Sequence, residues 1–209
     1  MANSIFKKTA RWQDLYFYRK ADTLYQLTVV FCRRFLPSHG DRTVDQMVQA
    51  ARSGKQNIVE GSEDGKTSTE MEVKLLNVAR ASIGELREDY LDYLKSHNLQ
   101  LWDSKHPRFD AMVDFCRQHN DFADYAPLAE HASDEEFCNM SLTLCHMTDR
   151  MMCNYLHYLE KRFVTEGGIR ERMHSARTGY RQEQDEKMRK LEQENQKLKK
   201  LLEEHGIAY

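Results

Sequence analysis

Residues 46–91 of the chain read QMVQAARSGKQNIVEGSEDGKTSTEMEVKLLNVARASIGELREDYL, and this stretch decides the fold. Apolar residues recur every three or four positions on both sides of a short glycine-containing segment. That interval places them on one face of an α-helix. We therefore expect one amphipathic helix, a turn and a second, longer helix.

The boundaries of these two helices have their own signals. Gly61 is expected to end the first helix in a left-handed cap. A capping box is expected to begin the second, formed by Thr69 with Glu72 or by Thr67 with Glu70. The periodicity then continues for about 28 residues, which exceeds the length of most globular helices.

The same helical spacing recurs in the rest of the chain. An earlier helix is predicted from Leu24, Leu27, Phe31 and Phe35, with Pro37 and Gly40 to stop it, and a later one from Phe137, Met140, Leu144, Met147, Met151, Tyr155 and Tyr158, ended by Gly167 and Gly168. Residues 98–133 interrupt the pattern, with one short helix expected at about 108–119. These features predict an all-α protein: an antiparallel four-helix bundle over residues 1–166 with an insertion at about 98–133.

Composition and charge limit the class of protein further. The 209 residues include five cysteines, an odd number without close pairing, which is typical of reduced thiols in a cytoplasmic protein. No apolar run approaches the roughly 20 residues that span a bilayer, so we expect no membrane partner. Residues 1–60 carry ten basic against five acidic residues, whereas residues 61–167 carry eleven against twenty. The charge is therefore uneven, although the total is only −2.

The stretch that decides the fold resembles a known family. It is similar to the bacterial four-helix bundle proteins related to those encoded within intervening sequences of large-subunit rRNA genes, a family that includes the accessory variability protein of diversity-generating retroelements. The matching positions are Gln46, Ala50, Ala51, Ser53, Asn57, Ile58, Glu60, Gly61, Leu75, Leu76, Ala79, Ser82, Glu85 and Leu86. The resemblance implies a non-enzymatic bundle that assembles as a pentameric ring, with nucleic acid or a nucleic-acid enzyme as its partner.

The C-terminal residues 185–206 follow a heptad that predicts a short coiled coil. The seam positions, called the zipper below, are Met188, Leu191, Asn195, Leu198 and Leu202. In a parallel pair Lys187 faces Glu192 of the second helix and Glu194 faces Lys199, and a single asparagine in the seam favours two strands in register. Pairing through a zipper and the five-fold ring implied by the resemblance are different assemblies, and the sequence leaves both open, together with a partner's helix as the other strand.

Residues 167–184 form a basic segment between the bundle and the zipper, and the resemblance matches it to a suffix that some family members carry. Arg170, His174, Arg177 and Arg181 share one face if the segment is helical, with Arg172 nearby. Arginine binds phosphate oxygens through paired hydrogen bonds, so these four arginines are candidate nucleic-acid contacts, with Arg33 and Arg34 as secondary candidates. The other interpretation is a solvated hinge, or arginines that dock on the acidic bundle.

No catalytic constellation, metal-ligand spacing or cofactor motif is found in the sequence. The segment from Gly61 to Thr67 is one residue short of a phosphate-binding loop and no strand precedes it. The acidic residues Glu85, Glu88, Asp89 and Asp92 are interpreted as a solvated face or a contact for a basic partner. We expect a non-catalytic oligomeric helical adaptor associated with RNA, DNA or an enzyme that processes them. The alternative is a protein-directed scaffold factor without nucleic-acid contact.

Overall fold

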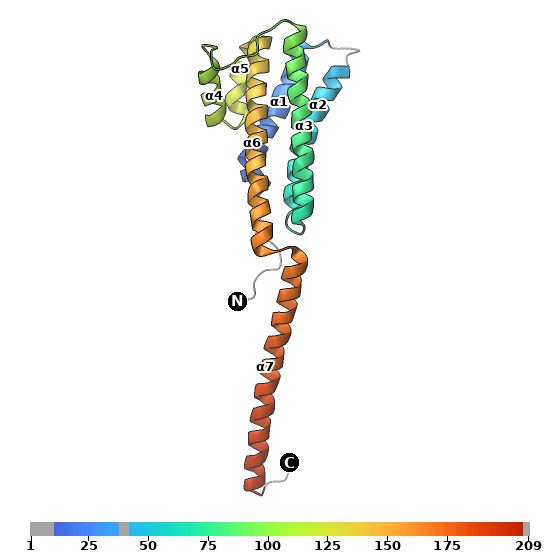
Figure 1. The fold of residues 1–209 in the computed structure, drawn as a ribbon, viewed down its shortest axis with the longest axis vertical. Coiled ribbons are helices and arrows are strands. Elements are labelled where there is room, and N and C mark those ends of the chain that lie inside the picture. Colours follow the sequence, from blue (N-terminus) through green and yellow to red (C-terminus); the bar gives the residue numbers. More distant parts are fainter. Residues whose placement is uncertain (1–10, 38–41, 207–209) are drawn as a thin grey trace. The chain divides into compact units, whose positions relative to one another are not determined.

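A computed structural model describes residues 11–37 and 42–206, without the side chain of residue 166. Every regular element within these two ranges is a helix, which confirms the all-α prediction (Figure 1). The elements are the 3-10 helix η1 (Trp12–Asp14) and the α-helices α1 (Tyr16–Phe35), α2 (Arg42–Asp64), α3 (Thr69–Ser96), α4 (Phe109–Gln118), α5 (Phe122–His131), α6 (Asp134–Glu166) and α7 (Ile169–Glu204).

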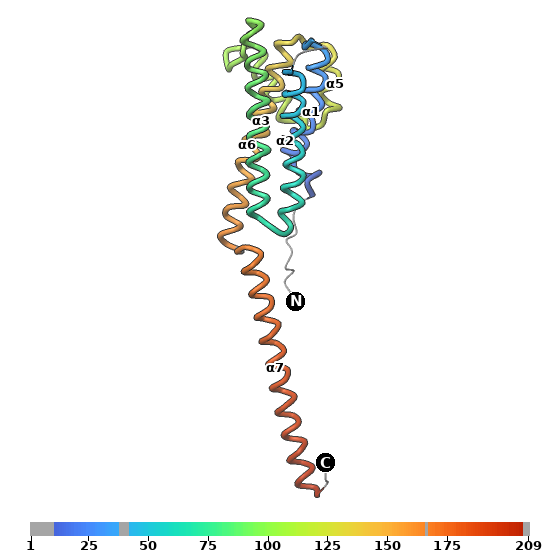
Figure 2. The backbone as a smooth tube through the Cα atoms, turned by 90° about the vertical axis from the view of Figure 1, so that its right-hand side faces the viewer, coloured from blue at the N-terminus to red at the C-terminus, as the bar shows by residue number. Residues whose placement is uncertain are grey.

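The chain divides into two compact units between residues 166 and 167. In the first unit α1 lies against α2 and α6, and α3 lies against the same two helices (Figures 1 and 2). The shorter α5 packs on α1, and α4 packs on α6. The second unit contains α7, whose residues are all exposed or half-buried. This helix runs without a break across residues 184 and 185, where the sequence suggested a boundary between suffix and coiled coil.

The core of the first unit contains most, but not all, of the apolar residues predicted from helical spacing. Tyr158 of the last predicted stripe is 52% exposed, because the buried face of α6 runs instead through Cys145, Met152 and Leu159. Leu24, Leu27 and Phe31 of α1 are at most 1% exposed, and so is Leu86 of α3. The ring of Phe31 lies 5.0 Å from that of the buried Tyr90, close to edge-on. Apolar burial of this kind contributes on the order of 25 cal/mol for each Å² removed from water, so these stripes hold the helices together.

Small side chains let α2 and α3 pack closely. A Cβ atom added to Gly54 would lie 2.9 Å from Cγ1 of Ile83, which is closer than carbon atoms pack. The hydroxyl groups of Ser53 and Ser82 are 3.0 Å apart across the same contact. The amide of Asn57 donates to the Ser53 carbonyl at 2.9 Å and so supports that serine from one turn away. Several of the residues that carry the family resemblance therefore have a packing role.

Two predicted helix boundaries between α2 and α3 are wrong. Gly61 does not end α2, which continues to Asp64. A Cβ atom at Gly61 would lie 3.3 Å from that of Leu75, so this glycine serves close packing inside the helix. Ser68 begins α3, because its hydroxyl accepts from the Met71 N–H at 3.1 Å. Neither Thr67 nor Thr69 takes that role, and Thr69 is already the first residue of the helix.

The other predicted ends agree with the structure where it describes them. The helix α1 ends two residues before Pro37, whereas Gly40 lies outside the described residues. Gly167, with φ of +70°, follows α6 in the left-handed conformation that glycine adopts without strain. The predicted length of α3, 28 residues, is confirmed. The short helix expected at about 108–119 is α4.

The helix α5 was not predicted, because Pro127 lies inside it and proline usually interrupts a helix.

A side chain of α1 holds the C-terminal end of α4. The ammonium group of the buried Lys20 donates to the carbonyls of Cys116 and His119, the latter at 3.0 Å. A cation at this end offsets the negative pole of the helix dipole. Burial lowers the pKa of Lys20.

No helix in the two described ranges is both long enough and apolar enough to cross a lipid bilayer.

The close contact of α2 and α3 makes a stability prediction. Gly54→Val should lower the free energy of unfolding by about 1–3 kcal/mol, because the new methyl groups overpack against Ile83. Gly84→Val is the matched control, since a Cβ atom at Gly84 meets nothing within 4 Å. It should change stability by less than about 0.5 kcal/mol. Urea unfolding followed by circular dichroism measures both, and equal losses would contradict the close-packing account.

Candidate functional site

Three of the predicted nucleic-acid contacts share one face of α7. Arg170, Arg177 and Arg181 are exposed and lie within about 40° of one another around the helix, at about 100° for each residue. His174 lies on the same side. We call these four residues the basic face. Arg172 does not belong to it, because two residues of helix turn its side chain by about 200° from Arg170. The residue is half-buried, and its Nε atom is buried.

The two secondary candidates on α1 differ from each other. Both residues are exposed at the end of the helix, and they differ in their contacts. Arg34 donates to the carbonyl of Ala129 and, at 3.0 Å, to that of Ala132, which form the C-terminal end of α5. Its guanidinium also lies 4.5 Å from the ring of Phe35. Arg34 therefore caps α5, as Lys20 caps α4, and these bonds compete with any phosphate contact.

The zipper residues lie on α7 as the heptad predicts. Met188, Leu191 and Leu198 are 58–60% exposed, and Leu202 is half-buried. Monomeric proteins rarely expose a continuous line of large apolar side chains along a helix. The line is thus available for a partner.

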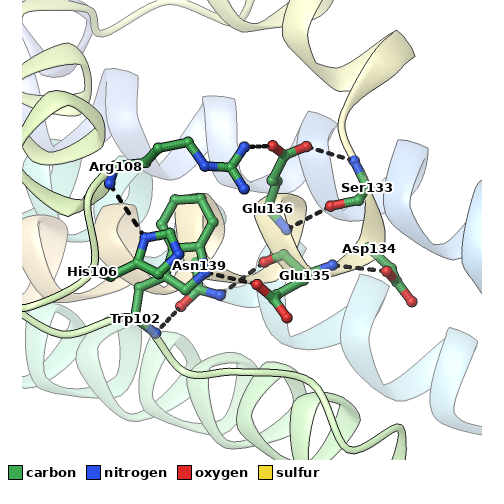
Figure 3. Close-up of polar contacts among 8 residues, drawn as sticks. All are labelled: Trp102, His106, Arg108, Ser133, Asp134, Glu135, Glu136 and Asn139. Atoms are coloured by element: carbon green, nitrogen blue, oxygen red, sulfur yellow. Dashed lines mark hydrogen bonds and ion pairs between the residues drawn. The ribbon is translucent and has the colours of Figure 1, made fainter.

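A polar node missed by the sequence interpretation joins the insertion to the start of α6 (Figure 3). Glu135 accepts from the Gln100 N–H at 2.9 Å and from the Trp102 indole N–H at 2.8 Å. Asn139 accepts from the Trp102 backbone N–H at 2.8 Å and donates to the Gln100 carbonyl at 2.9 Å. These hydrogen bonds hold the pKa of Glu135 below its usual value, and the bond from Trp102 has a larger effect than the bond from Gln100. The node fixes Trp102, which is 5% exposed.

A capping box beside this node begins α6. The Ser133 hydroxyl accepts from the Glu136 N–H at 3.2 Å, and the Glu136 carboxylate accepts from the Ser133 N–H at 2.9 Å. The other oxygen of Glu136 binds Arg108 (Figure 3). The spacing Ser-x-x-Glu before the apolar Phe137 is the sequence signal that would have located this helix start.

An apolar groove lies next to Arg108. The guanidinium of Arg108 sits 4.6 Å from the centre of the Trp102 ring, and the His106 ring stacks on the same indole at 3.9 Å. The groove holds about 510 Å³ and is lined mainly by α4, α5 and α6, with Met112, Phe115, Leu128 and Met140 as its large apolar side chains. Its apolar lining and single ion pair suit an apolar side chain of a partner more than a charged substrate.

Two of the four acidic residues predicted on α3 line a second, polar cleft. Glu85 and Asp89 line it together with Asp45 and Arg42 of α2, and it holds about 880 Å³. Burial, followed by the charges of Asp92 and Glu85, raises the pKa of Asp89. No set of three or more His, Cys, Asp or Glu side chains in the described part of the chain is arranged to bind a metal ion.

The cysteine thiols on α4 and α6 are held in the core. Cys116, Cys138 and Cys145 are at most 1% exposed, and Cys153 is half-buried. Burial raises the pKa of Cys116 to about 11 and that of Cys145 to about 12. These two thiols stay protonated at neutral pH and are poor nucleophiles, since the thiolate is the reactive form.

Comparisons with protein-family models, with curated proteins and with solved structures found no match.

The role of Arg34 as a cap is tested by a matched pair of neighbours. Arg34→Met should lower the free energy of unfolding by about 1–2 kcal/mol, because two carbonyls of α5 lose a charged donor. Arg33→Met should change it by less than about 0.5 kcal/mol, as exposed substitutions do. Chemical unfolding measures both variants. A loss at Arg33 as large as that at Arg34 would contradict the cap.

The buried thiols predict a loss of stability at alkaline pH. An unfolded thiol ionises near its ordinary pKa of 9.0, whereas folded Cys116 holds its proton to about 11 and Cys145 to about 12. Their contribution is complete below pH 9 and is lost as the pH rises through the folded pKa values, by about 1.4 kcal/mol per pH unit for each thiol at most.

Lys20 acts in the opposite direction, because its pKa is lowered on folding and stability from this group rises as the pH approaches 10.5. Tyr90 adds to the loss, because burial raises its pKa well above 10.0. Urea unfolding at several pH values between about 8 and 11 measures the net slope. Cys145→Ala should make the decline shallower, and an unchanged slope in this variant would reject the assignment.

Proposed function

We propose that this chain is a non-catalytic, self-associating helical adaptor that works in the cytoplasm with nucleic acid or with an enzyme that acts on nucleic acid. The proposal takes α1, α2, α3 and α6 as an antiparallel four-helix bundle, in agreement with the family resemblance. The absence of convergent reactive groups in the sequence motivates a binding role. Chemistry is then supplied by the partner.

The observation that carries the proposal is the surface of α7. The basic face presents three exposed arginines over about 16 Å of helix, at 1.5 Å for each residue. The exposed zipper continues on the same helix. Self-association would repeat the arginines, so that several weak phosphate contacts act together and gain avidity. Such contacts are electrostatic and independent of base sequence.

A second candidate function is a protein-directed scaffold, which the apolar groove between α4, α5 and α6 favours. Its large side chains and the ion pair of Arg108 with Glu136 at its edge have the composition of a small protein-binding site. Nuclease treatment during affinity purification separates the two functions. Partners lost after nuclease support the nucleic-acid adaptor, and partners that remain support the scaffold.

Charge reversal tests the basic face. The triple variant Arg170→Glu, Arg177→Glu and Arg181→Glu should weaken retention of RNA or DNA at low salt and reduce the slope of log affinity against log salt by about 2–3. The matched control is Arg189→Glu, Lys197→Glu and Lys200→Glu, which makes the same change of charge on other sides of α7. Filter binding across a salt series measures both, with helicity checked by circular dichroism.

Equal losses in the two triple variants would indicate a response to net charge and reject the basic face as the contact. Arg172→Glu alone, on the other side of the helix, should have a smaller effect than Arg177→Glu alone. Retention that is unchanged and insensitive to salt would reject direct nucleic-acid binding altogether.

A further inference from the structure

The apolar stripe of α7 extends well before the zipper. Going back from Met188, residues at intervals of four, four, four, three and four fall on the same side of the helix, at about 100° for each residue. They are Gln184, Tyr180, Ala176, Met173 and Ile169. Tyr180 is 64% exposed and Met173 is 52% exposed. The stripe therefore covers the basic segment as well as the zipper.

The spacing explains why a heptad search detects only the second half. The intervals of four on both sides of Gln184 insert extra residues into the heptad, an irregularity known as a stutter. From Ile169 to Leu202 the stripe makes nine steps over 33 residues, close to the 3.67 residues per turn of an 11-residue repeat. At this period the seam of two helices runs almost straight, so one continuous contact is geometrically allowed.

The extended stripe is also long enough for a stable coiled coil, which the zipper alone is not. The zipper alone is shorter than the three to four heptads that a stable coiled coil needs, whereas 33 residues exceed four heptads. None of the 36 residues of α7 is buried. Because helices in proteins are stabilised mostly by packing of an apolar face, a long helix without buried residues calls for a partner along its length.

We infer that α7 pairs in parallel with α7 of a second copy of this chain along the whole stripe, from Ile169 to Leu202. In register, Gln184 faces Gln184 of the second copy, and Asn195 faces Asn195 of the second copy. The side-chain amides of each pair can exchange hydrogen bonds. An antiparallel pair that overlays the two stripes end to end would place Asn195 against Ala176, where its amide has no partner.

Charge complementarity points to the same occupant. In the parallel pair Lys187 faces Glu192 of the second copy, and Glu194 faces Lys199. Lys187 also binds Glu183 of its own helix at 3.0 Å. An ammonium group has three donors, so both contacts can form together.

The pairing deepens the proposed function, on which this step rests. Arg170, Arg177 and Arg181 lie at the edge of the stripe, so two copies bring their arginines to one seam. Like charges held close repel each other, and a polyanion such as a nucleic-acid backbone would relieve that repulsion. The paired helix is thus the unit that binds phosphate.

Disulfide trapping in the full-length chain tests the inference. Met173→Cys and Tyr180→Cys place a thiol in the new part of the seam, and Leu191→Cys places one in the zipper. Ser175→Cys and Gln182→Cys are exposed controls. They lie about 160–200° around the helix from Met173 and Tyr180, respectively. The unmodified chain, with its own five cysteines, gives the background. We expect the three seam variants to form linked dimers at similar rates, at least tenfold faster than the two controls.

The possible outcomes separate the inference from the proposed function. Linking at Leu191→Cys but not at Tyr180→Cys or Met173→Cys would leave the zipper and overturn the extended seam. No linking at any seam position, with a dimeric mass by light scattering, would overturn parallel pairing. A monomeric mass would overturn self-association itself. The salt dependence of the arginine variants reports on nucleic-acid binding independently of all three.

Discussion

Where α2 and α3 meet, glycine, alanine and serine leave no room between the two helices for a larger side chain. At Gly54 a single added carbon would collide with Ile83, and at Gly61 it would crowd Leu75. This close approach lets the buried Leu76 and Leu86 of α3 join the core formed by α1 and α6. The turn between α2 and α3 is only four residues long, so the close approach and the short turn constrain each other.

The insertion between α3 and α6 packs Cys116, Tyr125 and Ala129 into the core of the first unit, and cations of α1 hold the ends of its helices. Lys20 binds the last carbonyls of α4, and Arg34 binds those of α5. Burying the Lys20 ammonium costs free energy, which the two carbonyl bonds offset only while the helix ends stay in place. The groove beside Trp102 exists because these caps and the Glu135 bonds position α4 against α6 and α5 against α1.

The two units differ in how much of their apolar surface they bury. The first unit buries an apolar core and also presents an apolar groove and a polar cleft. No residue of α7 is buried, and this helix presents arginines beside an apolar line. A protein of this kind gains specificity from assembly, because each surface is weak alone and becomes effective when copies or partners bring several together.

Helical periodicity in the sequence determined the all-α class, the extents of α3 and α4 and the zipper positions, because apolar spacing depends only on neighbours along one helix. The sequence also placed Arg170, Arg177 and Arg181 on one face for the same reason. Tertiary structure decided what local patterns do not contain. It made Gly61 a packing residue, turned Arg34 into a cap for a helix about 95 residues away, and formed α5 around Pro127. These outcomes depend on which distant carbonyls and side chains come into contact, and such contacts leave no periodic signal in the chain.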